Sequence, residues 1–394
     1  MLFAPFRGSL FDPARVPDIP SVTCPPYDVI NEAAERRYRA GAEHNMVRLL
    51  LAGPGDPTYQ DAARLLSTWR GDGTLRTDPD PRFYLYRMRY LDGTGTEHVA
   101  GGIIGALALL PLGDQILPHE ETMPKTKADR LSVLSATRAN LDLIIALTPS
   151  VDFAGLLTAA DPPRLSFEIE GVHHSLFDIT DPETISVISS AVEAHPVAIA
   201  DGHHRYTTGL AYQDLQEGPG PWDSIMTFLV PAQGSGLTIG PTHRVFPSAS
   251  IDVSQLSDRF TVEPCDPTPP TRPGTIVLVP SPGHQSGPMK LTAHPDQLAL
   301  LPAPWQQASP AVGRELLYPL IEVDEGQAAY FADAEEALQA GGEHPDGTVA
   351  LMATVSEQAI SAATESGLRF PQKSTFFVPK PRSGLVIRSF EDGS

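Results

Sequence analysis

The sequence predicts an α/β (α+β) protein with mixed sheets and interleaved helices. Short apolar runs of strand-like composition recur along the chain, and amphipathic runs with helical periodicity lie between them. We see no internal repeat that would indicate a solenoid or a propeller. The 394 residues are 41% hydrophobic and 19% charged, as in folded soluble proteins, and the length allows two domains.

The elements can be placed in order along the chain. Strands are expected at residues 44–50, 83–90, 98–109, 141–147, 165–178 (a hairpin), 197–200, 224–230, 237–246, 275–279, 289–292, 318–323 and 349–353, with a last hairpin formed by 373–380 and 384–387. Helices are expected at residues 31–42, 59–69, 129–140, 151–160, 182–194, 203–212, 333–340 and 357–367. We expect residues 1–245 to form a core domain and residues 246–394 a smaller α+β region packed on it.

Composition limits the classes of partner. The net charge of −20 argues against a general nucleic-acid or anionic-membrane surface, because phosphate backbones require a basic footprint. It does not exclude a small phosphorylated ligand. The two cysteines are far apart and form neither a disulfide framework nor a zinc knuckle. Without a signal-peptide pattern or a membrane-length apolar run, a cytoplasmic location is expected, and an oligomer is possible.

The most informative stretch follows the apolar run at residues 197–200. It consists of Asp201, Gly202, His203, His204 and Arg205, and an amphipathic segment comes next. This order predicts a strand, a tight turn and a helix whose first turn carries three donor side chains. Amide groups at a helix N-terminus and a guanidinium both bind phosphate oxygens, so an anion site is predicted. The alternative is a surface turn whose charges only face solvent.

A second polar stretch lies on the loop before the helix expected at 129–140. His119 and Glu120 follow a proline, and such a pair can act as a general base and as a metal or substrate ligand. Positive charge that can face phosphate comes from Lys125, Lys127, Arg130 and Arg138. Two alternatives stay open: Glu120 and the residue after it are solvated, or Arg130 pairs with Asp129.

Two further groups are candidates for a pocket. Tyr27 and Asp28 follow two prolines on a rigid loop, where they either form a pocket wall or, through Asp28, cap the helix expected at 31–42. Thr242, His243 and Arg244 stand at a strand end, where open sheets often bind ligands. An exposed loop is the alternative for this second group. The sequence identifies no metal ligands.

Taken together, these motifs resemble the domain of unknown function 1015 family. The resemblance rests on the Pro-Pro-Tyr-Asp start at residues 25–28, His119-Glu120-x-Thr122 leading to Asp129-Arg130, the turn at residues 201–205, Pro-Thr-His-Arg at 241–244 and Pro-Gln-Lys-Ser-Thr at 371–375. The motifs occur in order over nearly the whole chain. The family name does not fix an activity.

The central turn also resembles the ParB/sulfiredoxin-like superfamily, over Gly202, His204, Arg205 and Tyr206. His203 stands where sulfiredoxins have their catalytic cysteine, and no cysteine is near in sequence, so sulfiredoxin chemistry is not expected. The acidic charge argues against DNA partitioning. The resemblance then implies a nucleotide-dependent kinase of a small molecule, such as the free serine kinases.

That resemblance implies roles for the candidate residues and a cofactor, ATP or ADP with Mg²⁺. The implied phosphate-binding residues are Gly202, His203, His204, Arg205, Lys125, Arg130, Thr242, His243 and Arg244, and the implied catalytic residues are Glu120, His119 and Asp201. Glu120 would deprotonate the acceptor hydroxyl. The rival hypothesis is a non-catalytic regulatory protein that binds a nucleotide or a phosphometabolite. A metal-only hydrolase is disfavoured, because no His-x-x-x-His spacing is present.

Overall fold

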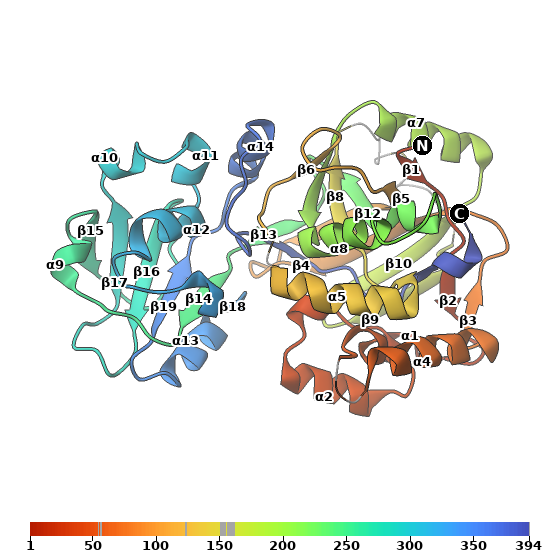
Figure 1. The fold of residues 1–394 in the computed structure, drawn as a ribbon, viewed down its shortest axis with the longest axis horizontal. Coiled ribbons are helices and arrows are strands. Elements are labelled where there is room, and N and C mark those ends of the chain that lie inside the picture. The colour runs from red at the N-terminus through yellow and green to blue at the C-terminus, as the bar shows by residue number, and fades with distance from the viewer. Residues whose placement is uncertain (54, 56, 123, 150–154, 156–161, 394) are drawn as a thin grey trace. The chain divides into compact units, whose positions relative to one another are not determined.

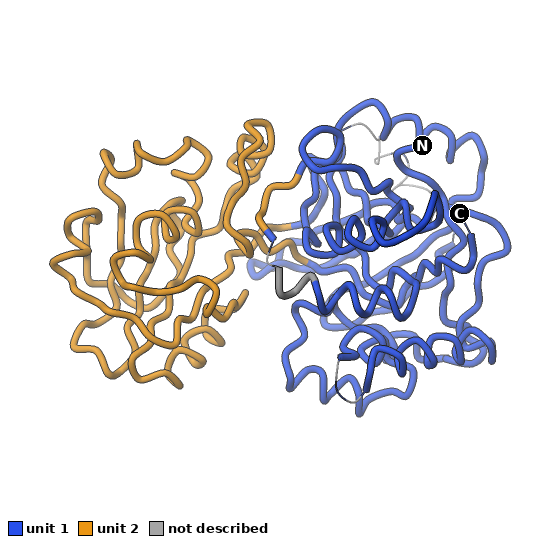
Figure 2. The backbone as a smooth tube through the Cα atoms, in the orientation of Figure 1, with its two compact units in different colours: residues 1–117, 122–237, 379–394 blue, residues 118–121, 238–378 orange. Residues whose placement is uncertain are grey.

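The computed structural model describes residues 1–53, 55, 57–122, 124–149, 155 and 162–393, without the side chains of residues 124–127. The chain forms two compact units (Figure 2). Unit 1 consists of residues 1–117, 122–237 and 379–394, and unit 2 of residues 118–121 and 238–378. The helix predicted at residues 151–160 lies outside the described residues.

The division of the chain can be compared with the boundary expected at residue 245. That position lies inside a strand of unit 2, β14 (His243–Phe246), and contacts group residues 238–245 with the region that follows them. Residues 379–394 return to unit 1 after the chain has passed through unit 2.

Unit 1 is built on a nine-stranded mixed sheet (Figure 1). The strand order is β6-β11-β8-β12-β5-β4-β10-β9, and β1 pairs with β5. Neighbours run antiparallel at most of the described pairings, whereas β8 and β12 are parallel. The strand bounds in this unit are β1 Phe3–Ala4, β2 Ser9–Phe11, β3 Leu75–Thr77, β4 Phe83–Leu91, β5 Glu97–Ala108, β6 Ile116–Pro118, β7 Ala139–Asn140, β8 Ile144–Thr148, β9 Leu165–Ile169, β10 Val172–Ile179, β11 Val197–Asp201, β12 Ser224–Pro231 and β21 Arg388–Ser389.

Helices pack on this sheet and on each other. Their bounds are α1 Ile19–Val22, α2 Glu32–Gly41, α3 Val47–Leu50, α4 Tyr59–Gly71, α5 Pro124–Thr137, α7 Pro182–Glu193 and α8 His203–Gln213. α8 contacts β8 and β12, α5 packs on α8, and α4 packs on α5. One apolar core joins the sheet to α7 and α8, and a second joins α3, α4 and α5 to the N-terminal segment.

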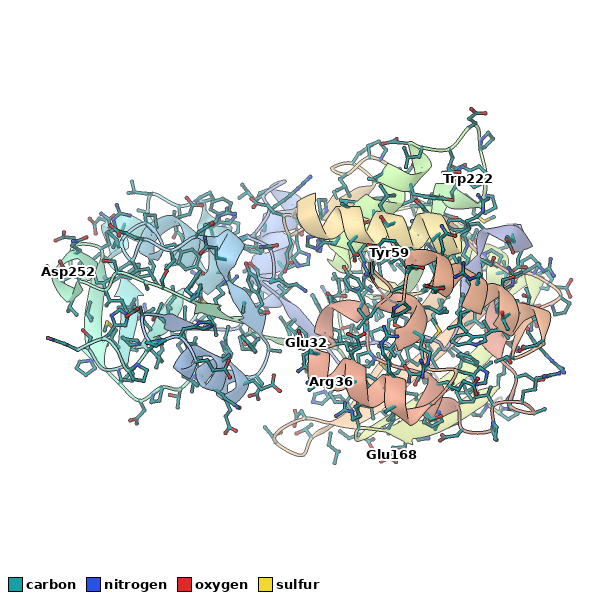
Figure 3. The ribbon with its side chains drawn as sticks, turned by 60° about the horizontal axis from the view of Figure 1, so that its bottom comes forward. Glu32, Arg36, Tyr59, Glu168, Trp222 and Asp252 are labelled. Atoms are coloured by element: carbon teal, nitrogen blue, oxygen red, sulfur yellow. The ribbon has the colours of Figure 1, made fainter. Side chains whose placement is uncertain are left out.

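Local sequence signals explain where these helices begin. The Asp181 side chain accepts a hydrogen bond from the Thr184 amide, and Pro182 opens α7 at a position where no amide partner is needed. Thr58 and Asp61 form a reciprocal capping box at the start of α4. α2 has no buried residue and presents Glu32 and Arg36 to solvent (Figure 3).

Unit 2 contains a six-stranded antiparallel sheet in the order β15-β17-β16-β19-β14-β18, and a separate pair, β13 with β20. Its strands are β13 Thr238–Gly240, β14, β15 Phe260–Pro264, β16 Thr275–Pro280, β17 Met289–Ala293, β18 Ala329–Phe331, β19 Thr348–Met352 and β20 Phe376–Val378. Its helices are α9 Val253–Leu256, α10 Pro295–Leu298, α11 Ala303–Gln306, α12 Ser309–Val312, α13 Ala334–Gly342 and α14 Glu357–Glu365. Among the described residues, no helix has the length and apolar character needed to cross a bilayer.

The mixed α/β class is confirmed, and so are most of the expected elements, but three strand predictions are wrong. Residues 44–50 contain the short helix α3, because Met46, Val47, Leu49 and Leu50 are all buried and the apparent alternation has no exposed face. Residues 318–323 form turns after a helical segment, and the backbone at Glu322 is left-handed (φ 54°), which a strand does not allow.

The third wrong prediction is the last hairpin. β20 pairs with β13 instead of with residues 384–387, and β21 pairs with β7. Two prolines, Pro379 and Pro381, and the left-handed Gly384 (φ 94°) separate the two segments, so the chain leaves β20 and returns to unit 1.

His174 in unit 1 and His243 in unit 2 are buried histidines whose pKa is lowered, and this makes both units sensitive to acid. Burial lowers the pKa of His174, which lies against the Tyr86 hydroxyl at 2.7 Å, to about 3. Burial lowers the pKa of His243 to about 4. Below about pH 6.5 the unfolded chain therefore binds protons that the folded chain does not. The free energy of unfolding then decreases as the pH is lowered, and at about pH 5 each histidine has reduced it by about 2 kcal/mol relative to neutral pH.

Urea unfolding measured at about pH 7 and about pH 5 checks this expectation. Trp69 and Trp222 report on unit 1 and Trp305 on unit 2. His174→Gln should remove most of the pH dependence of the unit 1 transition, and the exposed His195→Gln should leave it unchanged. Equal pH dependence in wild type and His174→Gln would show that His174 is protonated in the folded protein.

Candidate functional site

The predicted strand, turn and helix at residues 197–213 are confirmed. β11 ends at Asp201, Gly202 precedes α8, and His203, His204 and Arg205 form its first turn. Gly202 has φ 91°, a conformation that residues with a side chain avoid. A Cβ atom there would lie 2.8 Å from the Ile144 side chain. The glycine is therefore required both by the backbone angle and by the close packing of the turn.

The side chain of Asp201 binds two cations. Its Oδ2 accepts a hydrogen bond from Arg205 Nη2 at 2.6 Å, and its Oδ1 accepts one from Lys380 Nζ at 2.5 Å. The three side chains expose only 13%, 9% and 9% of their surface, respectively. Burial alone would raise the pKa of Asp201, but the charges of Lys380 and Arg205 outweigh it and hold this pKa below its usual range. The carboxylate is therefore ionised and shared.

The carboxyl groups of Asp28 and Asp142 also act on the charge of Arg205. Arg205 also donates from Nη1 to the Leu143 carbonyl. Burial works against its charge, but Asp201, Asp28 and Asp142 together outweigh this and raise the pKa of Arg205. Burial raises the pKa of Asp142, which accepts a hydrogen bond from the Ser383 hydroxyl. The site thus contains both signs of charge in a volume largely removed from water.

Asp28 does not cap α2, so that alternative is wrong. The cap is Asn31, whose side chain accepts a hydrogen bond from the Ala34 amide at 2.9 Å. Asp28 instead lies in a short helical turn, Tyr27–Val29, and its charge acts on Asp201 and Arg205.

A pocket of unit 1 adjoins the charged cluster. It is lined by Tyr27, Leu50, Arg130, Val133, Leu134, Ala139, Asn140, Leu141, Asp142, Arg205, Thr208 and Ile225. Thr208 follows Arg205 by three residues and lies on the same face of α8. It is 3% exposed, and its hydroxyl has no hydrogen-bond partner among the described residues. A buried hydroxyl without a partner in a pocket wall indicates a ligand or an ordered water there.

Arg130 shapes the wall of this pocket. Its guanidinium lies 4.3 Å from the centre of the Tyr27 ring and donates to the Leu50 carbonyl at 2.6 Å and to Asp129 at 2.9 Å. The pairing with Asp129 left open by the sequence is therefore present. Arg130 places the aromatic ring at the pocket.

Four other residues predicted for the site belong to helices of unit 1. His203 is buried at the start of α8, and His204 is partly exposed beside it. Lys125 and Lys127 belong to α5, but their side chains lie outside the described residues.

His119 and Glu120 belong to unit 2, where they contact the loop at residues 371–375. Glu120 accepts hydrogen bonds from the backbone amides of Lys373, Ser374 and Thr375 at 3.1, 3.0 and 2.8 Å. The Thr375 hydroxyl is 2.7 Å from the same carboxylate and 3.0 Å from His119 Nε2. The predicted pair is therefore brought together with Thr375, a residue of the motif at 371–375 to which the sequence assigned no role.

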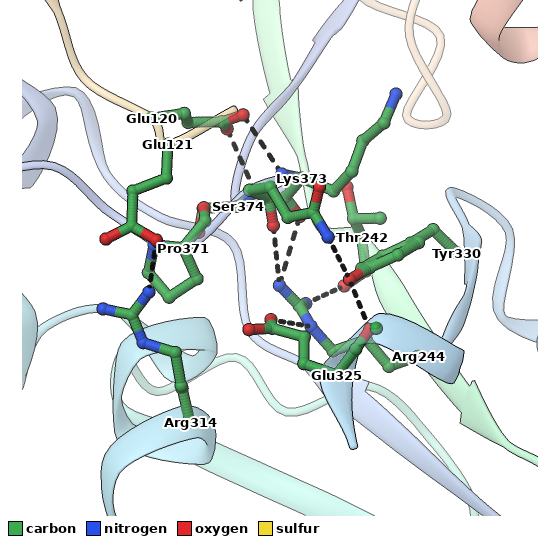
Figure 4. A network of polar contacts seen from close by, with 12 residues as sticks. Glu120, Glu121, Thr242, Arg244, Arg314, Glu325, Tyr330, Pro371, Lys373 and Ser374 are labelled. Atoms are coloured by element: carbon green, nitrogen blue, oxygen red, sulfur yellow. Dashed lines mark hydrogen bonds and ion pairs between the residues drawn. The ribbon is translucent and has the colours of Figure 1, made fainter. Parts of the chain in front are cut away.

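Thr242, His243 and Arg244 also lie in unit 2 and are buried. Figure 4 shows Thr242 and Arg244. Arg244 is fully buried and donates to the carbonyls of Thr242, Gln372 and Lys373 at 2.7, 3.3 and 3.3 Å. His243 Nδ1 accepts from the Met352 amide at 3.1 Å, and its low pKa makes the imidazole neutral near pH 7. In this structure Arg244 ties β14 to the loop that Glu120 contacts.

The sequence did not indicate Lys380, Asp142, Ser383 or Thr208. For Lys380 and Ser383 a signal was present: a proline-punctuated run with two basic residues, at 379–384, directly after the last motif. The sequence predicts a hairpin there, and the described residues form none. For Thr208 the signal was the helical spacing of three residues from Arg205.

The sequence model of a family described as "Protein of unknown function (DUF1015)" matches residues 3–302. No curated protein matches the chain. Among solved structures, SbnI with a C-terminal truncation from Staphylococcus aureus is 12% identical, with a TM-score of 0.41, over 71% of this chain and 85% of that chain.

Two further solved structures are similar in the same range. A variant of a free serine kinase in complex with ADP is 11% identical, with a TM-score of 0.40, over 72% of this chain and 95% of that chain. A conserved hypothetical protein from Pyrococcus furiosus is 12% identical, with a TM-score of 0.38, over 72% of this chain and 99% of that chain.

The shared carboxylate generates a stability prediction. Asp201→Asn leaves Arg205 and Lys380 buried without their common counter-charge, so the unfolding free energy of unit 1 should fall by about 3–5 kcal/mol. Urea unfolding followed by tryptophan fluorescence measures it. The matched control is Glu263→Gln, which removes an exposed pair with Lys290 and should change stability by less than about 1 kcal/mol. Equal, small effects of the two substitutions would contradict a shared buried carboxylate.

Proposed function

The chain belongs to the DUF1015 family of proteins of unknown function, and we propose that it is a nucleotide-dependent phosphotransferase acting on the hydroxyl of a small molecule such as free serine. One observation carries the proposal: two buried cations, Arg205 and Lys380, share a single carboxylate at the start of α8. The resemblance of residues 202–206 to nucleotide-binding turns supports it from the sequence.

A phosphate group would bind here by replacing the Asp201 carboxylate as the hydrogen-bond acceptor. Arg205 and Lys380 each place a donor on Asp201, and phosphate oxygens can take over both donors, since a phosphate group carries more charge and more acceptor atoms than one carboxylate. The amides at the N-terminus of α8 would add favourable dipoles, with Gly202 allowing close approach of the phosphate to the backbone. His203 and His204 stand in the same turn and remain proposed ligands.

Mg²⁺ is expected to accompany the nucleotide. Protein sites for nucleotide-bound Mg²⁺ need only one or two carboxylates, and Asp201 fits this need because its carboxylate is ionised and lies beside the proposed phosphate site. The ion would supply neutralisation of the phosphate charge. Among the described residues, no group of three or more acidic, histidine or cysteine side chains forms a separate metal site.

Glu120 is the proposed general base for the acceptor hydroxyl, with His119 beside it. Its carboxylate accepts four hydrogen bonds in this structure, so proton transfer requires it to leave at least some of these donors. For Arg244, Thr242 and His243 we propose a supporting role, in which Arg244 shapes the loop that contacts Glu120. Arg130 and Tyr27 line the unit 1 pocket, Asp28 remains a proposed substrate-pocket residue, and Lys125 remains a proposed phosphate ligand.

The alternative is a non-catalytic protein that binds a nucleotide or a phosphometabolite and has a regulatory role. One observation favours it: a carboxylate whose two oxygens accept four hydrogen bonds from its own unit resembles a structural anchor more than a base.

Phosphorus NMR distinguishes the two. The protein is incubated with ATP, ADP or CTP and Mg²⁺, with and without a panel of amino acids and polyols that includes serine. A new phosphomonoester signal that depends on one acceptor establishes the phosphotransferase and identifies its substrate. Nucleotide binding without turnover favours the regulatory protein. Absence of nucleotide binding overturns the phosphotransferase and leaves a phosphometabolite as the ligand of the regulatory protein.

Lys380→Ala tests the phosphate site. Loss of one charge-assisted contact should weaken nucleotide binding about 10- to 100-fold, measured by isothermal titration calorimetry. Lys290→Ala makes the same charge change on the surface of unit 2, where Lys290 pairs with Glu263 at 2.7 Å, and should bind nucleotide like wild type. If the two variants bind equally well, Lys380 does not contact the nucleotide.

Glu120→Gln tests the proposed base. The variant should bind nucleotide with wild-type affinity, and its turnover should fall by about 10²- to 10⁴-fold, the usual contribution of general base catalysis. Glu121→Gln is the control, since Glu121 pairs with Arg314 at 2.7 Å and has no proposed role in catalysis. Wild-type turnover by Glu120→Gln, per folded protein, would assign the base elsewhere.

A further inference from the structure

Three consecutive backbone amides in unit 2 point at one carboxylate. The amides of Lys373, Ser374 and Thr375 donate to Glu120 at 2.8–3.1 Å, and the Thr375 hydroxyl makes a fourth contact at 2.7 Å. Convergent successive amides form concave sites, called nests, that bind anions such as phosphate. Here the anion is a side chain of the same chain.

One residue of this loop has the left-handed backbone that occurs in nests. Lys373 has φ 53°, one of four described non-glycine residues with positive φ, and L-residues adopt this region reluctantly. Such strain persists where the surrounding structure enforces it, and it is concentrated at ligand-binding sites.

The loop is held in shape independently of Glu120. Arg244 donates to the carbonyls of Gln372 and Lys373 at 3.3 Å each, from the side opposite Glu120 (Figure 4). Within the loop, the Ser374 hydroxyl donates to the Pro371 carbonyl at 2.6 Å. The donors are therefore pre-organised by contacts that would remain if the Glu120 carboxylate moved.

The backbone around Glu120, in contrast, is held by hydrogen bonds that do not involve its side chain. On either side of it, the His119 carbonyl accepts from the Phe370 amide at 2.7 Å, and the Glu121 amide donates to the Phe370 carbonyl at 3.0 Å. The Glu120 side chain is 11% exposed, so it lies at the edge of the solvent-accessible surface. Rotation of this side chain alone would open the nest.

We propose that the amides of residues 373–375 form an oxyanion site that takes a phosphate or carboxylate group of a ligand, and that Glu120 occupies this site until the ligand arrives. The Glu120 carboxylate stands in for the ligand group, whose oxygens would accept the same four hydrogen bonds. The consequence of this release rests on the proposed function, in which Glu120 is the general base. The base would become available only once the ligand group is bound.

The nest can be tested without nucleotide or turnover. In Glu120→Ala the donors remain and the internal carboxylate is gone. Sodium phosphate or sodium acetate, compared with sodium chloride at equal ionic strength, should raise the melting temperature of this variant by about 2 °C or more beyond any effect on wild type. Glu121→Ala, which loses a carboxylate bound only to a side chain, should respond to these anions like wild type.

A double variant identifies the donors. Adding Thr375→Val to Glu120→Ala removes one of the four donors at constant shape and should reduce the anion response. If Glu120→Ala is unfolded in chloride, the same titration is read as recovery of the folded state. Stronger stabilisation by phosphate or by acetate assigns the ligand group. No difference from chloride, or an equal response in Glu121→Ala, overturns the proposal, while the nucleotide experiments on unit 1 stand independently of this result.

Discussion

A single ionised carboxylate, that of Asp201, joins three parts of unit 1 that are distant in sequence. It terminates β11, accepts a hydrogen bond from Arg205 on α8, and accepts another from Lys380, which is 179 residues away. Removing these charges from water is unfavourable unless each of them keeps its partner. The position of the segment that carries Lys380 is therefore tied to the geometry of the β11–α8 turn.

The same segment makes further buried polar contacts. Arg382 donates to the Thr23 carbonyl at 3.0 Å and to Glu170 at 2.9 Å. Arg388 is buried and donates to the Ser224 carbonyl at 3.0 Å. Basic side chains thus fix residues 379–394 in unit 1, and each depends on oxygen atoms from earlier in the chain. In both units, donors proposed to bind a ligand are hydrogen-bonded to a carboxylate of the same unit. In unit 1, Arg205 and Lys380 bind Asp201, and in unit 2 the amides of residues 373–375 bind Glu120.

The sequence was sufficient wherever the signal was local. The strand, turn and helix at 197–213 are specified by neighbouring residues: an apolar run, a glycine and a helical pattern. The partners of the candidate residues were not predictable in this way. Glu120 meets Lys373 across 253 residues, and Lys380 meets Asp201 across 179, and no periodicity connects such positions. Strand-like alternation also failed at residues 44–50, since burial on every side removes the exposed face on which that pattern depends.

The path of the chain through the two units has a consequence for synthesis. β13 and β20, the first and last strands of the 238–378 segment, pair with each other, so this segment is an insertion that closes on itself. A ribosome completes it before it adds Lys380 and Arg388. Unit 2 can therefore fold first, while Asp201 at the end of β11 has Arg205 as a partner but still lacks Lys380. A polypeptide released early, at the end of β20, would lack the Lys380 partner of that carboxylate although most of its sequence was intact, and Arg205 alone would have to balance the charge of Asp201.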